Sequence, residues 1–354
     1  MAHLIIRADG DLQMGTGHLM RLLSFAQFWL DGGDPVTFLT ASCDVLRDRF
    51  ENEGIEIVDI QSERASRQDG LQTQQLAEEV EDAVLMVDGP HFEDEFFETL
   101  RERSFPLVQV DDMGRLSEYH ADVVLNQNLH ATDEMYESRS GETRLCMGVE
   151  YILFRREIRR ASDEKRRYSK TLMNVLVTMG GSDPSNATLA VLQVLEGVMP
   201  EGGKVVVPVG AANPHIESLQ NWAASTSLNV ELVRNVREMS PLFLAADIAI
   251  SSGGTTVWEL AMFGVPTLVG VIADIENYLV EGLRSHELFR LAGDFRSMDR
   301  ELLEREFSTL VESSSEREKC GKHAAAFIDG LGVERLRSLC QRLNKTYKSN
   351  QTTD

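Results

Sequence analysis

One histidine occupies a position from which an imidazole could act on a ligand. Gly15-Thr16-Gly17-His18 follows the first apolar segment and opens a helical pattern. A nicotinamide fingerprint would need glycine where Met20 lies, and a P-loop would need lysine where His18 lies. The positive end of a helix disfavours a second positive charge, so the imidazole is expected to stay neutral and able to accept a proton. The alternative is a helix-start residue that is hydrogen-bonded locally.

Two glycine-containing segments in the second half of the chain could bind an anion. Met179-Gly180-Gly181-Ser182-Asp183 and Ser252-Gly253-Gly254-Thr255-Thr256 each follow an apolar run and precede a helical pattern. Glycines bring backbone N–H groups close to an anion, and the first turn of a helix leaves its N–H groups free, which suits a diphosphate. Glu259 could accept hydrogen bonds from ribose hydroxyls. The alternatives are a capped turn and a glutamate that stabilises the helix end.

Other polar clusters give weaker indications. Asp111 and Asp112 could bind a metal or the substrate, but neighbouring strand residues point in opposite directions, which disfavours joint chelation. Asn126-Gln127-Asn128 could hydrogen-bond a sugar, and an amide-rich loop is the equal alternative. His91-Phe92-Glu93-Asp94 lacks metal-ligand spacing and indicates a solvated helix start. The four cysteines form no CxxC pair, which favours buried free thiols over zinc or disulfides.

These segments need a scaffold that brings the ends of several strands together. Short apolar runs without polar alternation alternate with amphipathic segments, which is typical of parallel sheets covered on both faces. Two such series predict two doubly wound α/β domains. The expected helices include His18–Leu30 and Ala187–Val198, and the expected strands are Leu4–Arg7, Pro35–Leu39, Ile55–Ile60, Ala83–Val87, Leu107–Val110, Val123–Asn126, Leu172–Thr178, Lys204–Val209, Val230–Val233, Ile248–Ser251 and Thr267–Ile272.

A charged segment separates the two series. Residues 155–170 are dense in Arg, Lys and Glu and are expected to form a partly helical connector. We therefore predict an N-terminal Rossmann-like domain over residues 1–155 and a C-terminal one over 156–340. Residues 341–354 are predicted to be a polar tail.

Composition narrows the classes of function. The chain has 354 residues, of which 42% are hydrophobic and 26% charged, and a formal net charge of −22. Such a field repels phosphate backbones, so binding to nucleic acid or to an anionic membrane is not expected. The first residues lack a secretory signal, and no stretch reaches about 18 uninterrupted apolar residues. A cytoplasmic protein, a monomer or weak oligomer, is therefore expected.

The motifs taken together resemble a known family. Arg7-Ala8-Asp9 and Gly15-x-Gly17-His18-x-x-Arg21 look like the start of the UDP-sugar hydrolase of the pseudaminic acid pathway. Asp111-Asp112, Asp122 with Asn126-Gln127-Asn128, the region Gly148–Arg155, Gly180-Gly181-Ser182-Asp183-Pro184 and Gly253-Gly254-Thr255-Thr256-x-Trp258-Glu259 match the same family in order. Spore-coat polysaccharide glycosyltransferase-like proteins share the pattern, and the N-acetylglucosaminyltransferase that makes lipid II is more distantly similar.

The resemblance implies a fold, a reaction and a site. The fold is GT-B, with two Rossmann-like domains facing a cleft. The reaction is metal-independent hydrolysis of UDP-2,4-diacetamido-2,4,6-trideoxy-β-L-altropyranose or a similar UDP-sugar, without a cofactor. His18 would be the general base for the attacking water. Gly253, Gly254 and Thr255 would hold the diphosphate and Glu259 the ribose, and the further substrate-binding residues would be Gly15, Gly17, Arg21, Asp88, Asn126, Gly180, Gly181, Ser182, Thr256 and Asn277.

Two departures from the family pattern leave alternatives open. Ile275-Glu276 replaces the usual Asn-Gln pair, for which Asn277 could substitute in a shifted loop, and no tyrosine follows Asp88. A GT-B glycosyltransferase would use the same UDP-sugar donor and replace water by a sugar or lipid acceptor. A non-catalytic protein that binds nucleotide sugars is the third possibility.

Overall fold

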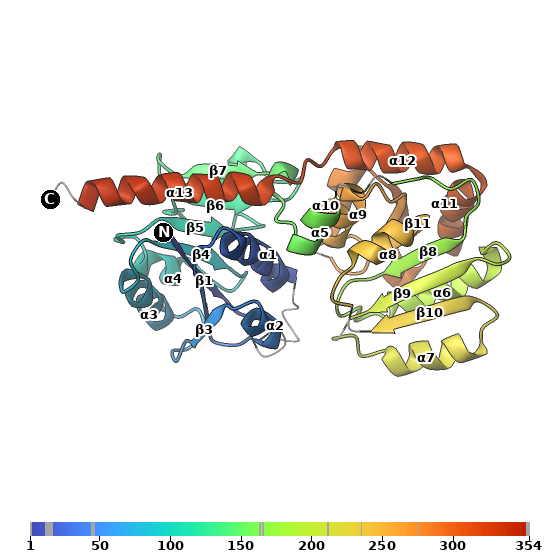
Figure 1. Ribbon diagram of the computed structural model, residues 1–354, viewed down its shortest axis with the longest axis horizontal. Helices are drawn as coiled ribbons and strands as arrows, with labels where there is room; N and C mark the ends of the chain where they lie inside the picture. Colours follow the sequence, from blue (N-terminus) through green and yellow to red (C-terminus); the bar gives the residue numbers. More distant parts are fainter. Residues whose placement is uncertain are drawn as a thin grey trace. The chain divides into compact units, whose positions relative to one another are not determined.

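The chain forms two compact units, each built on one sheet. The computed structural model describes residues 2–10, 17–43, 47–162, 164, 166–210, 212–234, 236–274 and 276–351. One unit comprises Met1–Arg156 with Gly330–Asp354, and the other comprises Glu157–Asp329. Each contains a parallel β-sheet with helices packed against it (Figure 1). The predicted pair of Rossmann-like α/β domains is confirmed.

The first unit has a seven-stranded sheet in the order β3-β2-β1-β4-β5-β6-β7, in which neighbouring strands are parallel. Alternate residues of β1 enter two different core clusters, Leu4 and Ile6 on one face and Ile5 on the other, so both faces are covered. The strands are β1 (His3–Ala8), β2 (Val36–Thr40), β3 (Glu56–Asp59), β4 (Ala83–Asp88), β5 (Leu107–Val110), β6 (Val123–Asn126) and β7 (Arg144–Met147). The helices before the second unit are α1 (Gly17–Asp31), α2 (Arg47–Asn52), α3 (Arg67–Glu78) and α4 (Asp94–Thr99), with 3-10 turns η1 (Asp133–Tyr136) and η2 (Val149–Tyr151).

The C-terminal helix α13 (Gly332–Gln351) belongs to the first unit. This corrects the predicted domain limit at residue 340 and the predicted polar tail from 341. Val333, Leu336 and Cys340 recur at helical spacing and are buried in the same core cluster as the apolar face of α1. Gly332 lies so close to η2 that a Cβ there would meet the carbonyl oxygen of Ile152 at 2.3 Å. The charged residues on the outer face of α13 conceal this apolar stripe in the sequence.

The second unit has a six-stranded parallel sheet in the order β10-β9-β8-β11-β12-β13. Its strands are β8 (Asn174–Thr178), β9 (Lys204–Val209), β10 (Asn229–Arg234), β11 (Ile248–Ser252), β12 (Thr267–Val271) and β13 (Arg290–Asp294). Its helices are α5 (Arg156–Ala161, at the boundary), α6 (Ala187–Val198), α7 (Ile216–Ser225), α8 (Ser240–Ala245), α9 (Thr256–Met262), α10 (Glu276–Ser285), α11 (Arg300–Glu312) and α12 (Ser314–Ala326), with the 3-10 turn η3 (Phe295–Ser297). The helix Ala187–Val198 and the strand Lys204–Val209 have the predicted bounds.

Each sheet has a point where the order of strands reverses. In the first sheet β1 lies beside β4, and in the second β8 lies beside β11. Loops that leave the carboxyl ends of such a strand pair diverge to opposite faces and open a crevice, which is where open α/β sheets bind ligands. The Gly17-His18, Gly180-Gly181 and Gly253-Gly254 motifs follow β1, β8 and β11, and Asp88 is the last residue of β4.

Candidate functional site

In the first unit, the polar residues after β1 and β4 are joined through Asp9. Its carboxylate is fully buried and accepts hydrogen bonds from Arg7 at 2.7 Å, from the backbone N–H of Ala41 at 2.6 Å and from Nε2 of His91 at 2.9 Å. Burial raises the pKa of Asp9, but the hydrogen bonds from His91 and Arg7 lower it by more, so the net pKa is well below its usual range. Asp9 therefore stays ionised and fixes the loop after β1.

His18 lies in the first turn of α1 and is held by the same residue. Its Nε2 is hydrogen-bonded to the backbone carbonyl oxygen of Asp9. A carbonyl only accepts, so Nε2 carries a proton, and in the neutral ring the lone pair is on Nδ1. Within the described residues no hydrogen bond reaches Nδ1, which makes this nitrogen the candidate acceptor for a proton from a ligand or from water. The local hydrogen bond of the alternative interpretation is present as well, and it orients the ring without using its basic nitrogen. Gly17 is exposed at the start of α1, and Gly15 lies outside the described residues.

Arg21 and Asp88, both predicted to bind substrate, bind each other. Nε and Nη2 of Arg21 each donate to the Asp88 carboxylate at 2.7 Å, and Nη1 lies 2.9 Å from Asp112. Asp88 is 1% exposed and Arg21 is 11% exposed. Burial lowers the pKa of Arg21, but the carboxylates of Asp112 and Asp88 raise it by more, and the guanidinium stays charged. The pair thus ties α1 to the end of β4 and leaves Arg21 without a free planar fork for a ligand.

Asn126 is fully buried and lies beneath the site rather than in it. Its amide donates to the hydroxyl of Tyr136 at 2.8 Å, and its side-chain oxygen accepts from Asn128. The prediction that Asn126 contacts a ligand directly is therefore wrong for this structure. Asn128 also donates to Asp112 at 2.7 Å, so Asn126 positions the residues that surround Arg21. Asp111 accepts from the backbone N–H groups of residues 113 and 114, which separates its role from that of Asp112.

In the second unit, the loop after β8 caps the helix that follows it, α6. The buried carboxylate of Asp183 accepts from the N–H groups of Ala187 at 2.7 Å and Thr188 at 3.0 Å, so the capped-turn alternative holds for these two donors of α6. Gly180 has φ of 74° and is exposed. Gly181 lies against the loop after β9, where a Cβ on Gly210 would meet the Gly181 oxygen at 2.2 Å. Ser182 is half-buried in this loop.

The loop after β11 has three backbone N–H groups without an acceptor among the described residues. The N–H of Gly253 donates to Gly270 at 2.9 Å, but no described group accepts from the N–H groups of Gly254, Thr255 and Thr256. Three consecutive N–H groups from which no described residue accepts, beside the strand-order reversal, are the candidate site for an anion. Glu259 lies one turn along α9 and is half-buried.

Glu276, the first residue of α10, lies against this loop and was not predicted to be a site residue. Its Oε2 accepts from the N–H of Ile272 at 2.7 Å, and a Cβ on Gly254 would lie 3.9 Å from its Oε1. Burial raises the pKa of Glu276, and hydrogen bonds from Ile272, Ala273 and Ser252 offset only part of the rise. Asn277 is exposed and donates to its own loop at the Asp274 oxygen, and Ile275 lies outside the described residues. Ile275-Glu276 replaces the Asn-Gln pair of the family that the sequence resembles, so the sequence did single out this position. It did not predict that Glu276 contacts the loop after β11.

The described residues contain neither a cluster suited to a metal ion nor a helix that could span a membrane. Within the ranges given above, no three His, Cys, Asp or Glu side chains are grouped so that they could hold a metal ion. The helices of those ranges are each too short or too polar to cross a membrane.

Residues 174–277, from β8 into α10, match the model of the glycosyltransferase family 28 C-terminal domain. Two relatives match a larger share of the chain. An uncharacterized protein of Methanocaldococcus jannaschii is 26% identical over 75% of this chain, which spans 55% of that protein. The spore coat polysaccharide biosynthesis protein SpsG of Bacillus subtilis is 24% identical over 67% of this chain and 69% of its own length.

Solved structures share the fold over nearly the whole chain. MurG of Acinetobacter baumannii covers 97% of this chain and all of its own at a TM-score of 0.67 and 15% identity. The Anabaena protein HepE, solved in complex with UDP-glucose, covers 99% at a TM-score of 0.58 and 12% identity. The chain thus has two Rossmann-like domains of the GT-B type, and its second domain resembles the C-terminal domain of family 28 glycosyltransferases.

Proposed function

We propose that this protein is a glycosyltransferase-type enzyme that takes a UDP-linked sugar as its donor. The observation that carries the proposal is the row of free N–H groups on Gly254, Thr255 and Thr256, beside the strand-order reversal of the second sheet. This loop lies inside the segment that matches the glycosyltransferase family 28 model. The similarity to SpsG and the GT-B fold support the same class of reaction.

The second unit binds the nucleotide in this proposal. The N–H groups of Gly254 and Thr255 bind the diphosphate, and the hydroxyls of Thr255 and Thr256 add donors. Glu259 accepts from the ribose hydroxyls. As the bond to the sugar breaks, negative charge grows on the leaving UDP, and fixed N–H donors stabilise it by several kcal/mol because they need no reorganisation.

The first unit supplies the base. The His18 ring is held through Nε2 by Asp9, which leaves Nδ1 to remove the proton from the attacking hydroxyl. A positioned general base typically contributes about 10²–10⁴-fold to the rate. The pair of Arg21 with Asp88 keeps α1, and with it His18, at the end of β4.

Hydrolysis is the second candidate, with water as the nucleophile and a UDP-linked amino sugar, such as the diacetamido-trideoxy-altropyranose, as the substrate. The tautomer of His18 serves both candidates, because a base that activates water needs the same free lone pair as one that activates an acceptor hydroxyl. The resemblance of the motif at Gly17-His18-x-x-Arg21 to the pseudaminic acid hydrolase supports hydrolysis. The choice between the two depends on the acceptor.

The test is to follow UDP release from a panel of UDP-sugars, with and without sugar and lipid-linked acceptors. Acceptor-dependent release supports transfer, and acceptor-independent release supports hydrolysis. In both cases we expect His18→Ala to lose at least about 10²-fold in rate with UDP affinity retained, and Glu259→Ala to lose UDP affinity. His286→Ala, an exposed histidine of the second unit, is the matched control. UDP binding without turnover of any UDP-sugar would refute the proposed enzymatic activity. Absence of UDP binding would refute the whole proposal.

A further inference from the structure

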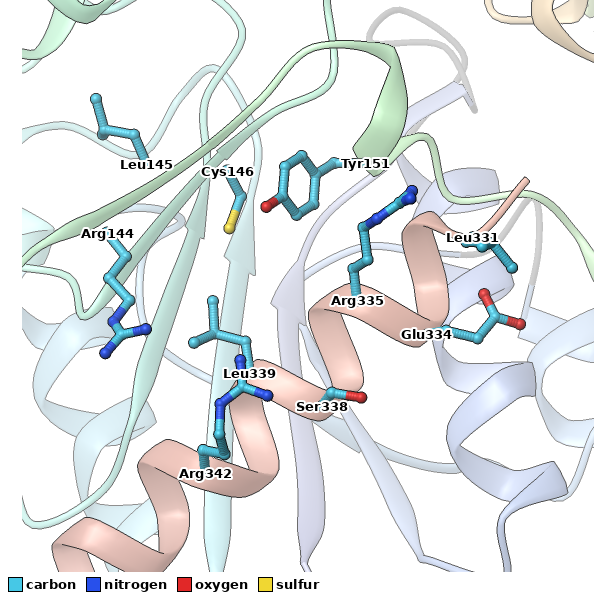
Figure 2. A pocket seen from close by; sticks show the side chains of 10 residues that line it. All are labelled: Arg144, Leu145, Cys146, Tyr151, Leu331, Glu334, Arg335, Ser338, Leu339 and Arg342. Atoms are coloured by element: carbon cyan, nitrogen blue, oxygen red, sulfur yellow. The ribbon is translucent and has the colours of Figure 1, made fainter. Parts of the chain in front are cut away.

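A cavity of about 710 Å³ lies between β7 and α13 in the first unit. Side chains from the edge strand, from η2 and from one face of the helix line it (Figure 2). This volume lies within the range of about 300–1,000 Å³ that is usual for small-molecule sites. None of the residues that line the cavity has a role in the proposed function.

The lining of the cavity is strongly cationic in a chain of net charge −22. Arg144, Arg335 and Arg342 line it against one carboxylate, Glu334. Arg335 is oriented by a hydrogen bond from its Nη1 to the carbonyl oxygen of Glu150 at 2.8 Å. Arg144 and Arg342 form no ion pair with any residue in the described ranges, and both are exposed. Two unpaired guanidinium groups that line one cavity repel each other, and a bound anion relieves that repulsion.

The other lining groups suit an anion that carries an organic body. Ser338 offers a hydroxyl beside the arginines. The floor is apolar, with the side chains of Leu339 and Cys146 buried. Figure 2 shows Arg144 and Arg342 toward one side of the cavity and Leu331, an exposed leucine, toward the other.

We propose that this cavity binds an organic phosphate, with its dianionic phosphate group on Arg144 and Arg342 and its body over Leu339 toward Leu331. Guanidinium forks match phosphate oxygens in bidentate pairs. The two guanidinium groups of Arg144 and Arg342 carry two positive charges, which match a dianion better than a single carboxylate ligand. The phosphate belongs either to a free small molecule or to a lipid headgroup.

The test measures phosphate binding with the proposed nucleotide site blocked. Calorimetry with inorganic pyrophosphate is run on the full chain in saturating UDP, and sedimentation is run with phosphatidylcholine vesicles with and without phosphatidic acid. The variant Arg144→Gln/Arg342→Gln is compared with Arg67→Gln/Arg160→Gln, which removes two exposed arginines elsewhere that are also unpaired within the described residues. We expect the cavity variant to lose about tenfold in affinity per arginine and the control to bind like the wild type.

The two probes distinguish the sources of the phosphate. Pyrophosphate binding that the cavity variant loses supports a free phosphate, and vesicle binding that only phosphatidic acid promotes and the variant loses supports a headgroup. Binding to neither probe, or equal loss in both double variants, overturns the proposal. Each single substitution is measured too, so a folding defect in the double variant does not decide the result. None of these readouts requires UDP-sugar turnover, so a failed enzyme assay would not count against the cavity.

Discussion

Replacing Glu276 by glutamine should tighten the binding of UDP. The carboxylate lies against the loop whose free N–H groups are proposed to hold the diphosphate, and its Oε2 accepts from Ile272 at 2.7 Å. A diphosphate on Gly254 would bring negative charge close to Glu276, because Oε1 is only 3.9 Å from the Cβ position of that glycine. Glutamine keeps an oxygen that can accept from Ile272 and removes the charge.

The size of the effect follows from that proximity. Two unit charges about 6 Å apart repel by about 3 kcal/mol at an effective dielectric constant of 20. The Glu276 side chain is only half-buried, so solvent screening reduces the cost. We expect a gain of about 1–2 kcal/mol, which corresponds to about tenfold in affinity.

Isothermal titration of UDP into both proteins measures this difference. Glu281→Gln on the same helix is the matched control, because Glu281 is 71% exposed and pairs only with Arg284 among the described residues. The pKa of Glu276 is raised by burial, so lowering the pH neutralises this carboxyl and should narrow the gap between wild type and variant. Weaker or unchanged UDP binding in Glu276→Gln would refute the placement of the diphosphate on this loop.

Two further substitutions test the scaffold by urea unfolding followed by circular dichroism. Asp88→Asn should lower the free energy of unfolding by about 3 kcal/mol, because it leaves the buried guanidinium of Arg21 with Asp112 alone. The control Glu98→Gln, in an exposed pair, should lower it by less than about 0.5 kcal/mol. Equally small losses in both variants would show that the buried pair does not stabilise the fold. Leu336→Ala should lower the free energy of unfolding by about 3 kcal/mol, because this side chain is fully buried in the first unit. The control Lys345→Ala, on the exposed face of α13, should leave it unchanged. A negligible effect of Leu336→Ala would mean that α13 does not pack firmly on the first unit.

Strands buried on both faces could be predicted, and so could the edge strands β3 and β10, whereas the edge strands β7 and β13 could not. β5, β6 and β9 appear in the sequence as continuous apolar runs because helices cover both sides of the sheet. β7 and β13 lie at sheet edges and carry Arg144 and Arg290 among partly exposed residues, so they have no apolar run and were not predicted. The course of α13 back to the first unit depends on contacts between distant residues, such as Arg337 with Asp34, 303 positions apart, which local patterns do not contain.

The sequence by itself determined the fold class, the two glycine loops and the candidate base, because glycine spacing and the place of a motif after a strand are local properties. Only the tertiary structure decided which of these residues are free to meet a ligand. It paired Arg21 with Asp88, buried Asn126, used Asp183 to cap α6 and brought Glu276 to the loop after β11. The physical reason is that hydrogen-bond saturation and burial depend on neighbours from distant strands, whereas residue type and spacing do not.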